Sequence, residues 1–129
     1  MMNIPSTLLY SKDHEWIKVE GKQATLGVTD FAQSQLGDVV FVEVPALDTE
    51  LSAGEGIGTI ESVKAVSDIY CPVSGTITTI NDELENSPQL INEDPYGDGW
   101  ICTIELANLD DLKDLLDAAA YTKLVNEEE

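Results

Sequence analysis

One lysine stands apart from the other reactive side chains of this sequence. Lys64 is the only basic residue between Lys22 and Lys113, and it lies in segment 61–68, which reads Glu-Ser-Val-Lys-Ala-Val-Ser-Asp. Both flanks of this segment have strand character, so Lys64 is expected where the chain reverses. A lysine at such a tip carries its amine into water on a long flexible stem. The residues alone leave two interpretations open, a solvated turn lysine and a functional one.

Other candidates for chemistry are few. The sequence has one histidine, His14, which excludes sites built from several histidines. Its two cysteines, Cys71 and Cys102, form no CxxC pair and are expected to be buried thiols in a reducing cytosol. No constellation of nucleophile, base and oxyanion donors is visible, and no spacing pairs two carboxylates as an acid and a base. The sequence therefore favours a binding or carrier protein over an enzyme.

The net charge argues against several kinds of partner. Six lysines, no arginine and 25 acidic residues give a formal charge of −19 over 129 residues. Binding to nucleic acid needs cations opposite the phosphates, and binding to an anionic membrane surface has the same requirement. No apolar run approaches the ~20 residues of a membrane-spanning helix, and residues 1–10 lack the pattern of a signal peptide. We therefore expect one soluble intracellular domain without nucleic-acid or membrane partners.

The elements that position Lys64 are expected to be mainly strands. Polar–apolar alternation and β-branched residues predict short strands separated by glycine- and proline-containing turns. These strands are expected at residues 15–19, 23–28, 39–44, 59–62, 66–71, 76–80 and 100–106. Many short strands at regular spacing are typical of a small β-sandwich or barrel.

Helices are expected at the edges of these strands. Thr29 or Asp30 can cap a short helix that ends at Gly37. The C-terminal segment, 108–125, is expected to be helical, with its first helix over 109–117. Leucines at helical spacing predict a stripe that faces the core, formed by Leu109, Leu112, Leu115 and Leu116.

The segment from Gly58 to Gly75 resembles the attachment region of lipoyl-carrier proteins. In that family, a lysine at a hairpin tip receives lipoate through an amide bond. The resemblance implies that Lys64 is the attachment site. It also implies a recognition role for Glu61, three residues before Lys64, and Gly75, eleven residues after it, because these positions are associated with the enzymes that attach lipoate.

Further segments resemble the H-protein of the glycine cleavage system, and together they cover nearly the whole chain. They are Tyr10–Trp16, Gly27–Asp30, Leu36–Val42, Pro95–Ile101 and the terminal helix Leu109–Tyr121. The resemblance implies one lipoyl-carrier domain over residues 1–129, with its attachment hairpin around 58–75. The implied fold is mainly β, a flattened hybrid barrel-sandwich of the lipoyl/biotinyl kind with short edge helices and a C-terminal helix.

The function implied by this resemblance is a shuttle without an active site of its own. Lipoate on Lys64 would receive the aminomethyl group of glycine from the pyridoxal-phosphate-dependent glycine decarboxylase (P-protein). Aminomethyltransferase (T-protein) would pass the one-carbon unit to tetrahydrofolate, and dihydrolipoamide dehydrogenase (L-protein) would reoxidise the dithiol. Lipoate-attaching enzymes are further implied partners. The implied location is the bacterial cytoplasm, or the mitochondrial matrix for a processed eukaryotic chain.

The resemblance also implies a place for the loaded arm. Glu15 and Asp68 resemble positions that line a surface cleft where the aminomethylated arm docks, although isolated carboxylates are often plain surface charges. Gln35 departs from the pattern, because some members of the family have a histidine there that contributes to the docked state.

Three alternatives stay open. A lipoyl domain of a 2-oxoacid dehydrogenase acyltransferase would be shorter and tethered by an Ala/Pro-rich linker. A biotinyl carrier would normally show Met-Lys-Met, where this chain has Val63-Lys64-Ala65. An acidic interaction module would carry no cofactor at all, and the mass of the intact protein distinguishes it from a carrier.

Overall fold

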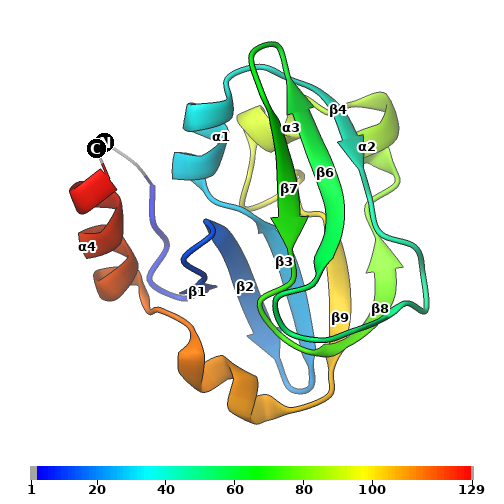
Figure 1. Cartoon of the computed structure of the whole chain (residues 1–129), viewed down its shortest axis with the longest axis vertical. Coiled ribbons are helices and arrows are strands. Elements are labelled where there is room, and N and C mark those ends of the chain that lie inside the picture. Colours follow the sequence, from blue (N-terminus) through cyan, green and yellow to red (C-terminus); the bar gives the residue numbers. More distant parts are fainter. Residues whose placement is uncertain (1–2, 129) are drawn as a thin grey trace.

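Two β-sheets packed face to face form the body of the protein in the computed structural model, which describes residues 3–128 (Figure 1). One sheet has six strands in the order β1-β2-β3-β9-β8-β5, and the other has three in the order β4-β6-β7. All neighbouring strands are antiparallel. The strands are β1 (Leu9–Tyr10), β2 (Glu15–Glu20), β3 (Gln23–Val28), β4 (Val39–Glu43), β5 (Glu50–Leu51), β6 (Gly56–Ser62), β7 (Val66–Tyr70), β8 (Gly75–Ile80) and β9 (Cys102–Leu106).

The predicted mainly-β sandwich with edge helices is confirmed, although within residues 3–128 the two sheets do not close into a barrel. Thr29 caps the first helix as predicted, since its hydroxyl oxygen accepts a hydrogen bond of 3.2 Å from the backbone N–H of Ala32. The helical elements are α1 (Asp30–Leu36), α2 (Glu83–Asn86), α3 (Leu90–Glu93), a 3₁₀ helix η1 (Leu109–Asp114) and α4 (Ala118–Glu128). No helix in the described part of the chain is long and apolar enough to cross a membrane.

The predicted α-helix over 109–117 is wrong. The 3₁₀ helix η1 replaces it, and Leu116 then pairs with Tyr10 of β1 through two backbone hydrogen bonds of 2.7 and 2.8 Å. A helical residue cannot make this bridge, so the long-range pairing overrides the helical spacing. The final helix α4 starts only after the bridge and continues to Glu128, beyond the predicted end of the helical segment at residue 125.

The predicted leucine stripe is divided by this interruption. Leu112 and Leu115 pack against the main core, whereas Leu109 is 50% exposed. Leu116 belongs instead to a second apolar cluster, in which the rings of Tyr10 and Tyr121 stack with their centroids 4.6 Å apart. This stacking fixes α4 against β1 (Figure 1).

The main core lies between the two sheets. Its fully buried centre draws on both, with Ile17, Leu26, Ile77 and Ile104 from the six-stranded sheet and Val42, Ile60 and Ile69 from the three-stranded sheet. Cys71 and Cys102 are buried free thiols, as predicted. Burial raises the pKa of the Cys71 thiol to about 11, so it is not a reactive nucleophile at neutral pH.

A close approach between strands explains the glycine at position 75. Gly75 begins β8 and pairs with Leu51 of β5 on one side and Leu106 of β9 on the other. A Cβ atom at this position would lie 2.2 Å from the backbone oxygen of Glu105 and 2.6 Å from Cγ2 of Ile104. Backbone cannot yield as a flexible side chain can, so this sheet requires a glycine here.

We predict that Gly75→Ala lowers the free energy of unfolding by about 1–3 kcal/mol, because the added methyl overpacks the β8–β9 contact. Urea denaturation measures the change. Gly56→Ala is the matched control, since a Cβ there would meet only Tyr70, at 4.0 Å, and the change should leave the free energy of unfolding unchanged or raise it by about 0.5–1 kcal/mol. Equal unfolding midpoints for the two variants would contradict this packing role.

Candidate functional site

Lys64 lies at the tip of the β6–β7 hairpin, which projects from the upper end of the molecule in Figure 1. The last cross-strand pair is Glu61 with Val66, so residues 62–65 form the turn. Ser62 closes this turn: its backbone N–H donates to the carbonyl of Ala65 at 2.8 Å, and its hydroxyl oxygen accepts from the N–H of Ala65 at 3.1 Å. A buried serine therefore holds the turn while the Lys64 side chain remains exposed.

The two residues expected to guide lipoate attachment have very different surroundings. Glu61 is exposed near the end of β6, where it is paired with Phe41 on one side and Val66 on the other. A protein that approaches the tip can reach it. Gly75 is buried in the other sheet, at the start of β8, which lies toward the opposite end of the molecule from the tip (Figure 1). The structure gives Gly75 a packing role, and its recognition role stays a prediction.

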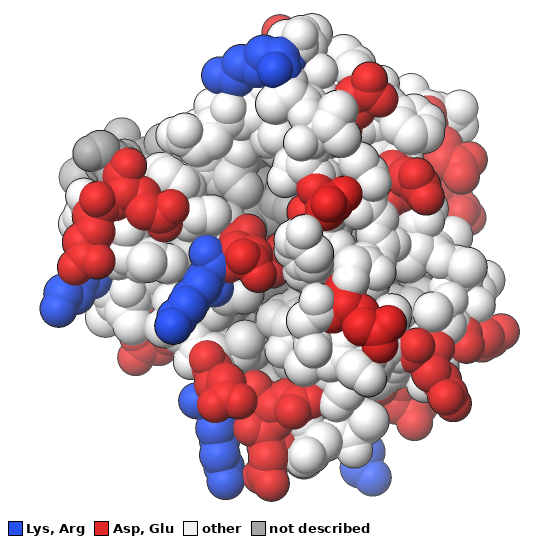
Figure 2. Space-filling model, viewed as in Figure 1, with Lys and Arg blue, Asp and Glu red and all other residues white. Residues whose placement is uncertain are grey.

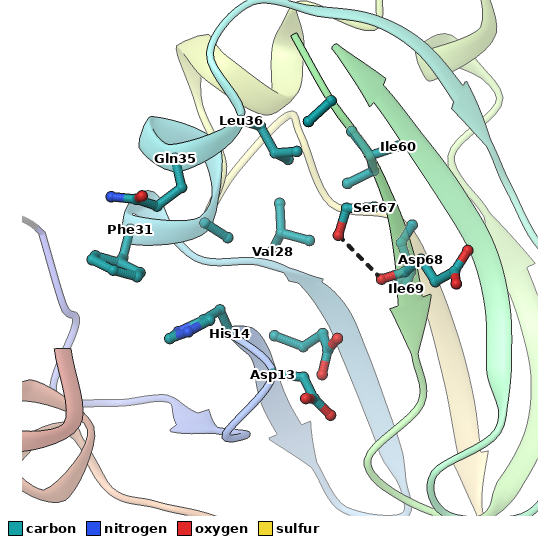
Figure 3. A pocket seen from close by; sticks show the side chains of 13 residues that line it. Asp13, His14, Val28, Phe31, Gln35, Leu36, Ile60, Ser67, Asp68 and Ile69 are labelled. Carbon is teal, nitrogen blue, oxygen red and sulfur yellow. Dashed lines mark hydrogen bonds between the residues drawn. The ribbon is translucent and has the colours of Figure 1, made fainter. Parts of the chain in front are cut away.

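A cavity of about 290 Å³ opens beside the hairpin (Figure 3). Side chains from α1 form one wall, and side chains from β6 and β7 face them across the opening. The lining consists of Phe31, Ala32, Gln35 and Leu36 on α1, Ile60, Ala65, Ser67, Asp68 and Ile69 on the hairpin, Val28, and the segment Asp13–Glu15. Glu15, Asp68 and Gln35, singled out in the sequence, thus come together in one cavity that begins one residue from Lys64.

Glu15 is the buried acid of this cavity, with only 2% of the residue exposed. One carboxyl oxygen, Oε1, accepts a hydrogen bond of 2.5 Å from the hydroxyl of Ser11. The other, Oε2, accepts one of 3.3 Å from the backbone N–H of Tyr70 at the end of β7. Since Glu15 begins β2, its carboxyl group joins the two sheets at the cavity.

Burial raises the pKa of the Glu15 carboxyl from 4.5 to about 7. The hydrogen bonds from Ser11 and Tyr70 oppose this shift, and the charge of Asp13 adds to it. The group is therefore poised to change charge near neutral pH. A cation that enters the cavity favours the ionised form, because the attraction between opposite charges is stronger where water is excluded.

Asp68 lines the rim of the cavity on β7 and is exposed. The hydroxyl of Tyr70 lies 3.5 Å from its Oδ2, a long contact that restrains it little. In Figure 3 the Asp68 carboxylate points away from the cavity, so contact with an occupant requires rotation of the side chain. Figure 3 also shows Leu36 extending from α1 toward the hairpin, where it supplies apolar surface, while the Phe31 ring lies on the His14 side of the cavity.

His14 connects the cavity to the C-terminal helix. Its backbone has a φ of +69°, which is unusual for a residue other than glycine. The ring packs against Phe31, with centroids 4.8 Å apart, while Nδ1 lies 2.8 Å from the Tyr121 hydroxyl and Nε2 lies 3.2 Å from Glu128. Sequence reasoning missed these partners, which lie more than a hundred residues away, and also Ser11, which carries no motif of its own.

The cavity is electrostatically suited to a cation. Three carboxylates line it, from Asp13, Glu15 and Asp68, and among the described residues no lysine does. Carboxylates also predominate over the face of the molecule seen in Figure 2, where most of the lysines lie at the margins and one lies further in, beside a carboxylate. No group of three or more His, Cys, Asp or Glu residues in the described part could hold a metal ion. The arrangement fits an organic cation with an apolar body.

Comparison with known proteins assigns the chain to a family. Residues 8–128 match the model of the glycine cleavage H-protein family. The chain is 57% identical to the glycine cleavage system H protein of Symbiobacterium thermophilum, covering 98% of this chain and 99% of that one. It is 52% identical to the H protein of Carboxydothermus hydrogenoformans, covering 99% and 98% of the two chains. The crystal structure of the Mycobacterium marinum H protein superposes with a TM-score of 0.85 at 35% identity, covering 97% and 98%. This chain belongs to the glycine cleavage H-protein family.

Proposed function

We propose that this protein is the lipoyl carrier of a glycine cleavage system, with lipoate joined to Nζ of Lys64 by an amide bond. The observation that carries this proposal is an exposed primary amine on a well-held hairpin tip, beside a cavity lined by carboxylates and apolar side chains. Family membership supports it. The bacterial origin of the compared relatives supports a cytoplasmic location.

The residues present fit the lipoyl group. The Lys64 stem and a lipoyl chain together reach on the order of 14 Å by bond lengths, and the cavity starts at the neighbouring Ala65. Phe31, Leu36 and Ile60 offer apolar contact to the ring and chain of such an arm. When bound, lipoate supplies a dithiolane that takes up the aminomethyl group of glycine and is later reoxidised.

The chain would carry this cargo among three enzymes. In the proposed order, glycine decarboxylase (P-protein) loads the carrier, aminomethyltransferase (T-protein) unloads it and dihydrolipoamide dehydrogenase (L-protein) restores it. The protein itself holds the attachment point and provides no catalytic group. Its charge of −19 draws it toward basic surfaces of such partners.

Between these encounters, the cavity would shelter the loaded arm. A loaded arm carries a primary amine, and its protonated form is the kind of cation that the cavity suits. The carboxyl group of Glu15 would pair with it, held in place by Ser11 and by the N–H of Tyr70. Apolar walls exclude water, which strengthens this pairing and slows hydrolysis of the cargo. Asp68 would add a second, weaker contact at the rim.

Lys64→Arg is expected to abolish lipoylation, because the guanidinium keeps the charge but lacks the amine that forms the amide. The intact mass after expression with lipoate and a lipoate ligase measures the attachment. Lys22→Arg is the control, a turn lysine between β2 and β3 that should leave one lipoyl group per chain. Lipoate on the Lys64→Arg variant, or on another lysine of the wild type, would contradict the assignment.

Glu15→Gln and Asp68→Asn are expected to shorten the lifetime of the loaded arm by roughly fivefold each, corresponding to about 1 kcal/mol for a partly wet ion pair. Formaldehyde and ammonia released from loaded protein, kept apart from aminomethyltransferase, report the lifetime. Glu43→Gln removes an exposed carboxylate of β4, outside the cavity, and serves as the control. Equal lifetimes in all three variants and the wild type would mean that these carboxylates do not shelter the arm.

The charge state of Glu15 in the empty cavity is open to a separate test. Since its folded pKa of about 7 lies above the unfolded 4.5, the native state binds the proton more tightly. The stability from this group is complete below pH 4.5 and is lost as the pH rises to about 7, by up to about 3 kcal/mol. Urea denaturation at about pH 5 and pH 8 should therefore show that the free energy of unfolding of Glu15→Gln, relative to that of the wild type, is higher at pH 8 than at pH 5. A constant difference between the two proteins would contradict the raised pKa.

A further inference from the structure

The segment Gly37–Val39, which links α1 to β4, contacts the hairpin tip at Val63 and Lys64. The carbonyl of Asp38 accepts a hydrogen bond of 3.0 Å from the backbone N–H of Val63. A Cβ atom on Gly37 would lie 3.3 Å from Cε of Lys64 and 3.9 Å from its Nζ. The lysine stem therefore lies over Gly37, and its neighbour in the turn is hydrogen-bonded to the same segment.

Gly37 adopts a backbone conformation that side chains disfavour. Its φ of +75° and ψ of −156° fall in a region that is populated almost only by glycine. This conformation ends α1 while the Gly37 N–H still donates to the carbonyl of Gln33 at 3.0 Å. Because glycine has no Cβ, the same residue also leaves room for the Lys64 stem to pass.

One asparagine side chain forms hydrogen bonds with both ends of this segment. Asn92, in α3, accepts a hydrogen bond of 2.8 Å from the backbone N–H of Val39 through Oδ1. Its Nδ2 donates to the carbonyl of Gly37 at 2.8 Å and to Oε1 of Gln33 at 3.0 Å. All three contacts satisfy polar groups at the end of α1 and the start of β4, so the position of Asp38 between them depends on Asn92.

We infer that Asn92 is a positioning residue for the lipoyl lysine: it holds Gly37–Val39 in place, and that segment holds the hairpin tip and the base of the arm. This inference rests on the proposed attachment of lipoate to Lys64. The stem starts beside the last turn of α1, whose Gln35 and Leu36 line the cavity. A fixed start directs the arm toward the cavity and lowers the conformational entropy lost on docking.

The test compares two asparagines that make the same number of contacts. Asn92→Asp keeps the size of the side chain and the acceptor to Val39, but it places a carboxylate oxygen against the carbonyl of Gly37. Asn81→Asp is the matched control. The Nδ2 of Asn81 donates to the carbonyls of Asp98 and Trp100, and its Oδ1 accepts from the N–H of Glu83. Asn92→Ala removes the three side-chain hydrogen bonds of Asn92 without adding charge.

Three measurements separate positioning from general stability. In unlipoylated protein, NMR-detected hydrogen exchange of the Val63 amide should rise at least about fivefold in both Asn92 variants, but not in Asn81→Asp at an equal distance below its Tm. In lipoylated, amine-loaded protein, the arm lifetime should fall in the Asn92 variants and not in the control. We also expect the resonance of Lys64 Cε to shift only in the Asn92 variants.

Unchanged Val63 exchange and an unchanged Lys64 resonance in both Asn92 variants would overturn the inference, as would equal effects in Asn81→Asp. The exchange measurement needs no lipoate, so it decides the positioning of the tip by itself. The mass of the wild-type protein, together with that of its peptide containing Lys64, decides whether Lys64 carries lipoate. Failure of the positioning role and failure of the proposed function can therefore be told apart.

Discussion

The carboxyl group of Glu15, buried where the two sheets meet, is the constraint on which the candidate site depends. It begins β2 and accepts a hydrogen bond from the last residue of β7, so it joins the two sheets. Removing an ionised carboxylate from water costs several kcal/mol unless a partner compensates. The two hydrogen-bond donors, Ser11 and Tyr70, offset part of that cost. Because the pKa is near 7, the carboxyl group is partly protonated at neutral pH, which limits the remaining cost. An acid poised in this way would respond to a cation that enters the cavity, such as the amine of the loaded arm in the proposed function.

If Lys64 carries lipoate as proposed, charge would make the cavity respond to the state of that arm. The cavity is lined by three carboxylates, and lipoylation would remove the single cation of the hairpin tip by turning the Lys64 amine into an amide. A neutral arm then gains only apolar contact with residues such as Phe31 and Leu36. An arm that carries an amine gains the electrostatic term as well. The same walls can therefore hold the loaded arm more tightly than the empty one without any change of shape.

Local patterns predicted those features of the fold that local forces decide. Strand β2 runs over Glu15–Glu20, close to the predicted 15–19, because a half-buried sheet imposes a period of two on its side chains. The turn around Lys64 followed from the strand signals on both sides. The pairing of Leu116 with Tyr10 could not be predicted, since the helical spacing of the leucines gives no sign of a partner a hundred residues earlier. Nor does alternation reveal the burial of Glu15, which depends on how the second sheet lies across the first.

The proposed carrier would have to bind its loaded arm and still release it to each enzyme. Tethering would give its arm an effective concentration at the cavity in the millimolar range or above, so even weak contacts would suffice for docking. A strong site would compete with every enzyme that must draw the arm out. The exposed carboxylate of Asp68 is screened by water and salt, and the Glu15 carboxyl is only partly ionised near neutral pH. Both features keep docking modest, while the closed turn at Ser62 keeps the attachment point fixed. The free energies of the docked and the released arm would then differ by an amount small enough for contacts with a partner's surface to supply.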